Sequence, residues 1–262
     1  MNDRRSALVL VHGAWGGAWV WRRVLEPLRA AGHEVHAVTL TGDGDRAHLR
    51  RPDISLRTHI DDVLALVHAE ELDDVVLVGH SYGGMVITGA AAALEGERPG
   101  RVTGLIYVDA MAPYSGEGWG VGHAPDVAAA RLALAAQHGN ALPPPDPSQG
   151  FGLDAADAEW LRRRHVAHPF GMYREPLEYD EELLAAVPRQ FIDCNHPGYP
   201  NIEPIRRRVR ETPGWNVAVI PTGHFPMVTE PEALVHNMLS FMDGRTRGGE
   251  VLARSRRVVS PD

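Results

Sequence analysis

The chain contains no lysine, because all 26 of its cationic residues are arginine. A lysine Schiff base and a lysine-dependent phosphate-binding loop are therefore excluded. The sequence also lacks a Gly-x-Gly-x-x-Gly fingerprint after a strand, since Gly42-Asp43-Gly44 has no third glycine. We therefore expect neither nicotinamide nor flavin chemistry, and no cofactor.

Cysteine is scarce, and net positive charge and long apolar runs are absent. Cys194 is the single cysteine, which excludes an internal disulfide and favours a reducing cytoplasm. The net charge of −8 argues against nucleic-acid binding. No apolar run reaches the length of about 18 residues that a membrane span needs, and Met1–Arg5 leads into a strand without a signal-peptide pattern. We expect a cytoplasmic protein that acts on a small-molecule substrate, without nucleic-acid or membrane partners. The oligomeric state stays open, with a homodimer as one alternative.

Apolar runs typical of buried strands alternate with helical patterns along the chain. The predicted strands are Ala7–Val11, Glu34–Leu40, Val75–Gly79, Val102–Asp109, Arg189–Cys194 and Asn216–Ile220. The predicted helices are Trp19–Ala31, Leu56–Glu70, Met85–Leu94, Val127–His138, Ala155–His165, Ile202–Glu211 and Glu230–Met242. This alternation predicts an α/β fold with a mostly parallel sheet of about six strands flanked by helices.

The alternation is interrupted after the fourth predicted strand. Residues 112–188 are rich in proline, glycine and alanine, and they are too long for a structureless loop, so we interpret them as a helical cap. Residues 1–111 and 189–243 then form the two parts of the core domain. Residues 244–262 carry several arginines without apolar periodicity, which predicts a disordered tail.

Ser81 lies in the pattern Gly79-His80-Ser81-Tyr82-Gly83, directly after the apolar run Asp74–Val78. A serine at this place between a strand and a helix is typical of a nucleophile elbow, a sharp turn that exposes the hydroxyl above the sheet. Glycines two residues away on either side let the flanking backbone pass without a Cβ clash. The sequence therefore predicts that Ser81 is a nucleophile.

A serine hydroxyl needs a base to accept its proton and donors to stabilise the oxyanion that follows. Of the 14 histidines, His224 follows the last predicted strand, at the carboxyl edge where ligands bind in such folds. The oxyanion donors are expected to be the backbone amides of Tyr82 and Ala14. His12 is interpreted as a structural brace of its loop.

The chain resembles α/β-hydrolases of the branch that contains esterases, plant methylesterases and hydroxynitrile lyases. The resemblance rests on Val11–Trp21, Thr39–Gly42, Gly79–Gly84 and Thr222–His224, and it covers nearly all of the chain except the cap and tail. It implies the α/β-hydrolase fold, with the cap inserted after the fourth strand. It also implies that Ser81 and His224 carry the chemistry and that Ala14 and Tyr82 form the oxyanion hole. Lyases of the branch tend to carry a threonine at the position of Gly13 and a lysine at that of Phe225, so cyanohydrin cleavage is disfavoured here.

The acid that orients the histidine is where the sequence departs from the resemblance. Plant relatives carry it at the position of Pro197, which cannot orient a histidine. Asp109, at the tip of the strand after the elbow, is the preferred alternative. Asp193 and a Ser–His dyad without an acid stay open.

We expect a serine hydrolase that cleaves a carboxylic ester or lactone of a small apolar substrate through an acyl-enzyme, with no metal. Trp15, Met111 and Trp119 are candidate substrate-binding residues. His165 and His168 lack further ligands at metal-binding spacing, so we interpret them as a pair on the cap surface. Two other functions stay open: a non-hydrolytic cyclase, acyl transferase or lyase that uses the same serine and histidine, and a ligand receptor without turnover.

Overall fold

Six parallel strands form the central sheet of the protein. The computed structural model describes the backbone of residues 6–121 and 123–257. The sheet has the strand order β10-β9-β4-β3-β1-β2, and all of its pairs are parallel. Its strands are β1 (Ala7–Val11), β2 (Val35–Val38), β3 (Val75–His80), β4 (Val102–Val108), β9 (Arg189–Cys194) and β10 (Trp215–Ile220). The predicted fold class is confirmed, and the elbow follows a central strand.

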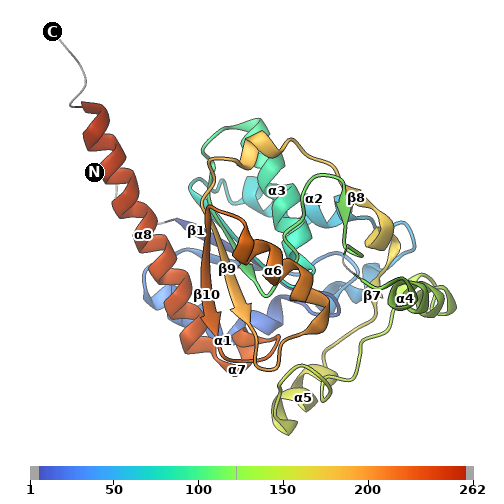
Figure 1. The fold of residues 1–262 in the computed structure, drawn as a ribbon. Coiled ribbons are helices and arrows are strands. Elements are labelled where there is room, and N and C mark those ends of the chain that lie inside the picture. The colour runs from blue at the N-terminus through green and yellow to red at the C-terminus, as the bar shows by residue number, and fades with distance from the viewer. Residues whose placement is uncertain (1–5, 122, 258–262) are drawn as a thin grey trace.

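Helices cover both faces of this sheet. Successive strand residues point to opposite sides, so an apolar strand places apolar side chains on both faces, and both must be covered. Val9 and Val11 pack on one side and Leu8 and Leu10 on the other, in two separate apolar clusters. The first cluster includes residues of α2 (Leu56–Ala69), α3 (Gly83–Glu97) and α6 (Glu203–Glu211). The second includes residues of α1 (Arg22–Ala30), α7 (Pro226–Thr229) and α8 (Pro231–Arg257). Figure 1 shows the resulting three layers.

The segment between β4 and β9 contains helices α4 (Pro125–Gln137) and α5 (Ala155–Arg162), which lie away from the sheet in Figure 1. It also contains two antiparallel strand pairs that the sequence did not predict. These are β5 (Glu117–Gly118) with β8 (Pro176–Leu177), and β6 (Ala141–Leu142) with β7 (His168–Pro169). Strands of two residues are too short to show any periodicity. The segment is therefore not purely helical.

The remaining short elements are 3₁₀ turns. They are η1 (Ala18–Trp21), η2 (Gly44–Leu49), η3 (Gly171–Arg174), η4 (Glu181–Leu184) and η5 (Pro200–Ile202).

The structure continues α8 to Arg257, through part of the segment from Gly244 onward that the sequence predicts to be a disordered tail. In Figure 1 this end of α8 extends beyond the rest of the molecule. A helix needs only its own backbone hydrogen bonds, and arginine, alanine and leucine favour it without an apolar stripe. Residues 258–262 lie outside the described part of the chain. Among the described residues, every helix is too short or too polar to cross a membrane.

Candidate active site

Ser81 lies on the sharp turn between β3 and α3, as the sequence predicted. Its φ angle is 53°, in the left-handed region that is costly for a residue with a side chain. The turn is held by hydrogen bonds from the Ser81 amide to the Val108 carbonyl (3.3 Å) and from the Met111 amide to the Ser81 carbonyl (2.9 Å). These bonds attach the elbow to the end of β4.

The glycines around Ser81 are required by close backbone contacts. A Cβ on Gly79 would lie 2.6 Å from the carbonyl oxygen of Gly83, and a Cβ on Gly83 would lie 2.7 Å from the oxygen of Val11. A Cβ on Gly84 would lie only 1.8 Å from the oxygen of Met111. Because backbone atoms cannot move aside as side chains can, the tight elbow depends on this spacing of glycines.

The structure brings together Ser81, His224 and Asp109, although they lie far apart in the sequence. The Ser81 Oγ is 3.0 Å from His224 Nε2. On the other side of the ring, His224 Nδ1 is 2.6 Å from Asp109 Oδ2. The Asp109 carboxyl accepts a hydrogen bond from the Nδ1–H group, which leaves Nε2 unprotonated and able to accept the proton of Ser81. The arrangement is that of a serine nucleophile, its base and an orienting acid.

Burial controls the charge of this pair. It raises the pKa of Asp109, an effect that Arg206 opposes, and it lowers the pKa of His224. Both shifts have the same cause, since a buried ionised group loses its hydration. The neutral imidazole needed for a base is therefore favoured, and protons on the two groups are shared by the pair.

The other candidate acids do not contact His224. Asp193 directs its carboxyl to Arg206 and Arg210. Pro197 follows β9 in a short turn closed by a bridge between Asn195 and Gly198. Asp109 reaches the histidine because it directly follows β4, with a φ of 43° that turns the chain at the sheet edge.

Of the two predicted oxyanion donors, Tyr82 directly follows Ser81, and Ala14 follows Gly13, whose added Cβ would lie 2.9 Å from the Ser81 Cβ. Among the described residues, neither the Ala14 amide nor the Tyr82 amide donates a hydrogen bond. The Tyr82 side chain is anchored by a 2.9 Å hydrogen bond between its hydroxyl and His59 Nδ1. His12 braces the loop after β1, which contains Ala14. Its Nε2 accepts a hydrogen bond from the Leu40 amide at 3.0 Å, and its Nδ1 donates to the Gly13 carbonyl at 2.6 Å. Both amides are therefore held in place and available to a ligand.

The cavity in front of Ser81 has an apolar side and a polar side. The three residues predicted to bind substrate all line it. The full lining is Trp15, Ser81, Met111, Trp119, His123, Arg131, Tyr199, Asn201 and Ile202. Its free volume is about 10 Å³, close to the space that one water molecule occupies.

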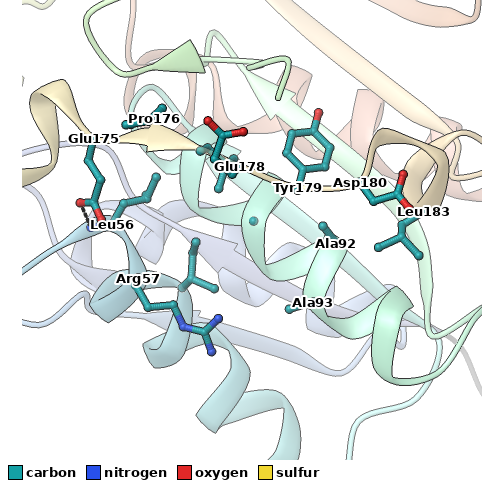
Figure 2. A pocket seen from close by; sticks show the side chains of 13 residues that line it. Leu56, Arg57, Ala92, Ala93, Glu175, Pro176, Glu178, Tyr179, Asp180 and Leu183 are labelled. Carbon is teal, nitrogen blue, oxygen red and sulfur yellow. Dashed lines mark hydrogen bonds between the residues drawn. The ribbon is translucent and has the colours of Figure 1, made fainter. Parts of the chain in front are cut away.

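A second, larger pocket lies between α2, α3 and the segment from Glu175 to Leu183, with a volume of about 360 Å³. Figure 2 shows Arg57, Glu175 and Asp180 around it, and Glu175 accepts the Leu56 amide at 3.0 Å. None of the residues that line it is a serine, cysteine or histidine. It therefore offers neither a serine or cysteine nucleophile nor an imidazole base, in contrast to the smaller cavity at Ser81.

The interpretation of His165 and His168 as a surface pair is wrong. His168 is fully buried, and its Nδ1 lies 2.8 Å from Asp43 Oδ2, so it ties the cap to the loop after β2. His165 packs against Trp19 and Phe225. Among the residues that the structure describes, no group of three or more histidine, cysteine or acidic residues could hold a metal.

Sequence reasoning missed Arg206, which contacts Asp109, and Arg131 and Tyr199, which line the cavity. The Tyr199 ring lies 4.4 Å from that of His224. Arg206 had one available signal, since it directly follows Ile205 on the apolar side of a helix.

The elbow, the hydrogen-bonded serine and histidine, and the parallel sheet define a class of enzymes with the α/β-hydrolase fold. A family model described as the alpha/beta hydrolase family matches residues 8–237. This chain belongs to that family.

Individual relatives agree with this assignment. The chain is 37% identical to a carbendazim hydrolyzing esterase of a Nocardioides species, with 88% of this chain and 97% of that protein covered. It is 27% identical to a pyrethroid hydrolase of Sphingobium wenxiniae, over 90% of this chain and 87% of that one. Its fold is similar to that of an extracellular alpha/beta-hydrolase from a Paenibacillus species. That structure has a TM-score of 0.78 and 20% identity, and 90% of this chain and 98% of that chain are covered.

Proposed function

We propose that this chain is a carboxylic ester hydrolase that works through an acyl-enzyme on Ser81. The observation that carries the proposal is the pair of hydrogen bonds on His224, at 3.0 Å to Ser81 and 2.6 Å to Asp109. The similarity to a bacterial esterase over 88% of the chain supports the same reaction class.

The reaction needs only groups that this site holds. Ser81 Oγ attacks the ester carbonyl while its proton passes to His224 Nε2, and Asp109 stabilises the imidazolium that forms. The oxyanion accepts hydrogen bonds from the Ala14 and Tyr82 amides, and the imidazolium protonates the departing alcohol. A water molecule, deprotonated by the same histidine, then releases the acid and restores Ser81.

The cavity lining favours a small, largely apolar substrate. Trp15, Met111 and Trp119 supply an apolar wall, and Trp119 packs on Tyr82 with ring centroids 4.9 Å apart. Since the free volume is about 10 Å³, substrate binding requires side chains on the cap side to move. Because relatives are named for carbendazim and pyrethroid hydrolysis, these two compounds belong in the first substrate panel.

Hydrolysis of p-nitrophenyl acetate and butyrate, together with carbendazim and a pyrethroid, tests the proposal. Wild type should turn over at least one of these compounds. Ser81→Ala should lose at least about 10³-fold in kcat, as removal of a serine nucleophile does in other serine hydrolases. Ser240→Ala, which changes an exposed serine of α8, is the matched control and should behave as wild type.

Undiminished turnover in Ser81→Ala would exclude covalent catalysis by this residue. Tight binding of the same compounds by wild type without any turnover would favour a receptor. Formation of a product other than the free acid and alcohol would favour a transferase, cyclase or lyase.

A further inference from the structure

Arg206 is a buried arginine in direct contact with the acid of the site. It lies on α6 with 1% of its surface exposed, whereas Arg207 beside it is exposed. A buried guanidinium is costly unless all of its donors are paired. Here the side chain donates to Asp109, Glu203 and the carbonyls of Cys194 and Tyr199. Each nitrogen of the guanidinium therefore has a hydrogen-bond partner in the buried region next to Asp109.

The guanidinium holds the Asp109 carboxyl by both oxygens. Arg206 Nε donates to Oδ1 at 3.0 Å and Nη2 donates to Oδ2 at 2.9 Å. The same Oδ2 accepts a hydrogen bond from His224 Nδ1 at 2.6 Å. A two-point contact of this kind fixes the plane of a carboxylate as well as its position. The direction in which Asp109 faces the imidazole is therefore set by Arg206.

Arg206 also organises the loop after β9, which contains Pro197 and Tyr199. Its Nη1 donates to the Tyr199 carbonyl at 3.0 Å, and the Tyr199 ring packs on His224. Its Nη2 donates to the Cys194 carbonyl at 2.9 Å, at the end of β9. Two groups in contact with the imidazole, Asp109 and Tyr199, are thus held by one side chain.

A second carboxylate balances the arginine. Asp193 Oδ1 lies 3.2 Å from Arg206 Nε. Because the single Nε hydrogen already points to Asp109, this is a contact of charges and not a hydrogen bond. The other oxygen of Asp193 pairs with Arg210, which is partly exposed. Asp193 therefore offsets part of the positive charge that Asp109 and His224 experience.

We propose that Arg206 is a positioning residue for the Asp109–His224 pair. It keeps Asp109 ionised and His224 neutral, so that the imidazole can accept a proton, and Asp193 limits this effect. The inference rests on the proposed function, because it concerns the same base. A positive charge beside the pair disfavours the uptake of a proton by either member. The base thus stays available to Ser81 at lower pH than it would without Arg206.

Other titratable or charged groups face this site from each neighbouring element. They are His80 at the end of β3, Asp193 and Cys194 on β9, Tyr199 on the loop, and Glu203 and Arg210 on α6. Burial lowers the pKa of His80 well below its usual range, so this neighbour is neutral. Its ring packs 4.6 Å from that of His224, and its Nε2 donates to the His224 carbonyl at 2.7 Å. Among the groups named here, Arg206 is therefore the buried cation that contacts the Asp109–His224 pair.

The test is the dependence of kcat/KM on pH for Arg206→Gln, Arg206→Lys and the control Arg207→Gln. Loss of the charge in Arg206→Gln should move the acidic limb of the profile upward by about 1–2 pH units. Arg206→Lys keeps the charge, so its limb should stay near that of wild type while kcat falls, because an ammonium cannot replace the two-point contact. Arg207→Gln should leave the limb unchanged, since Arg207 is exposed and outside the contacts described.

Asp193→Asn provides an independent test with the opposite sign, and it leaves Arg206 in place. Removal of this negative charge leaves the arginine less compensated, so the acidic limb should move to lower pH. An Arg206→Gln profile identical to wild type, or an Asp193→Asn limb that stays or moves upward, would overturn the inference. If Arg206→Gln does not fold, the Asp193→Asn profile decides. An inactive Ser81→Ala alongside either contrary result rejects the role of Arg206 alone, whereas an active Ser81→Ala rejects the proposed function itself.

Discussion

The replacement Asp109→Asn should remove most of the activity without removing the nucleophile or the base. The structure explains why an amide cannot take over from this carboxyl group. Both carboxyl oxygens accept hydrogen bonds, one from Arg206 Nε and the other from Arg206 Nη2 and His224 Nδ1. An asparagine has one oxygen and one NH₂ group, so in either orientation its NH₂ faces an arginine donor.

The replacement also changes the preferred tautomer of His224. An NH₂ group at the Oδ2 position favours the tautomer of His224 that is protonated at Nε2, which cannot accept the proton of Ser81. Loss of the correct tautomer costs about 10⁴ in kcat in a serine protease, which corresponds to about 5.5 kcal/mol of barrier. We expect a decrease of about 10³ to 10⁴ in kcat for p-nitrophenyl butyrate, with a small change in KM.

The matched control is Asp43→Asn, because Asp43 is also buried and also pairs with a histidine, His168. This control should lower stability and should lower turnover far less than Asp109→Asn does, because His168 packs on Tyr82 and Trp119 but has no contact with Ser81 or His224. Thermal unfolding of both variants separates folding from catalysis. Near wild-type kcat in a folded Asp109→Asn would refute the reasoning and return the search to a Ser–His dyad.

Three further outcomes follow from the geometry. Gly84→Ala places a Cβ 1.8 Å from the Met111 oxygen and should cost at least about 3 kcal/mol in denaturant unfolding, whereas Gly96→Ala on the same helix meets nothing closer than 3.7 Å and should be tolerated. Arg131→Met removes the cation from the cavity wall. Because this cation attracts a negatively charged acyl chain, the change should lower kcat/KM for mono-p-nitrophenyl glutarate about tenfold relative to uncharged p-nitrophenyl butyrate. Equal losses for the two esters would contradict this role of Arg131. Burial lowers the pKa of His165 from 6.5 to about 4, so its contribution to stability is present above pH 6.5 and is lost as the pH falls through 4. The free energy of unfolding of His165→Gln should accordingly depend on pH less than that of wild type, by about 1.4 kcal/mol per pH unit in this window. Identical slopes would show that His165 does not contribute.

The sheet and the sharp turn at Ser81 could be predicted because their signals are local. The strand β1 and the first four residues of β3 are continuous apolar runs, and the elbow is a five-residue pattern that begins at the end of β3. His224 could be placed because the last strand and the last helix bracket it. Sequence order along an α/β sheet fixes which edge such residues occupy.

The acid could not be decided in this way, because it depends on distances between side chains of separate strands. Asp109 and Asp193 both lie at the carboxyl ends of neighbouring strands, and only the coordinates show which one faces the histidine. Arg206 was hidden for a similar reason. It is one of four arginines on α6, and its place beside Ile205 indicates the buried side of the helix but not a contact with an acid on another strand. In the cap, two-residue strands and the buried contact between His168 and Asp43 carry no periodic signal.

Peptide mass spectrometry of an acid-quenched reaction with p-nitrophenyl acetate tests the central claim most directly. An acetyl group should form on Ser81 with the first burst of p-nitrophenol and decay at the rate of turnover. In His224→Ala the same adduct should form far more slowly. Steady turnover with Ser81 unmodified throughout would contradict catalysis through an acyl-enzyme on Ser81.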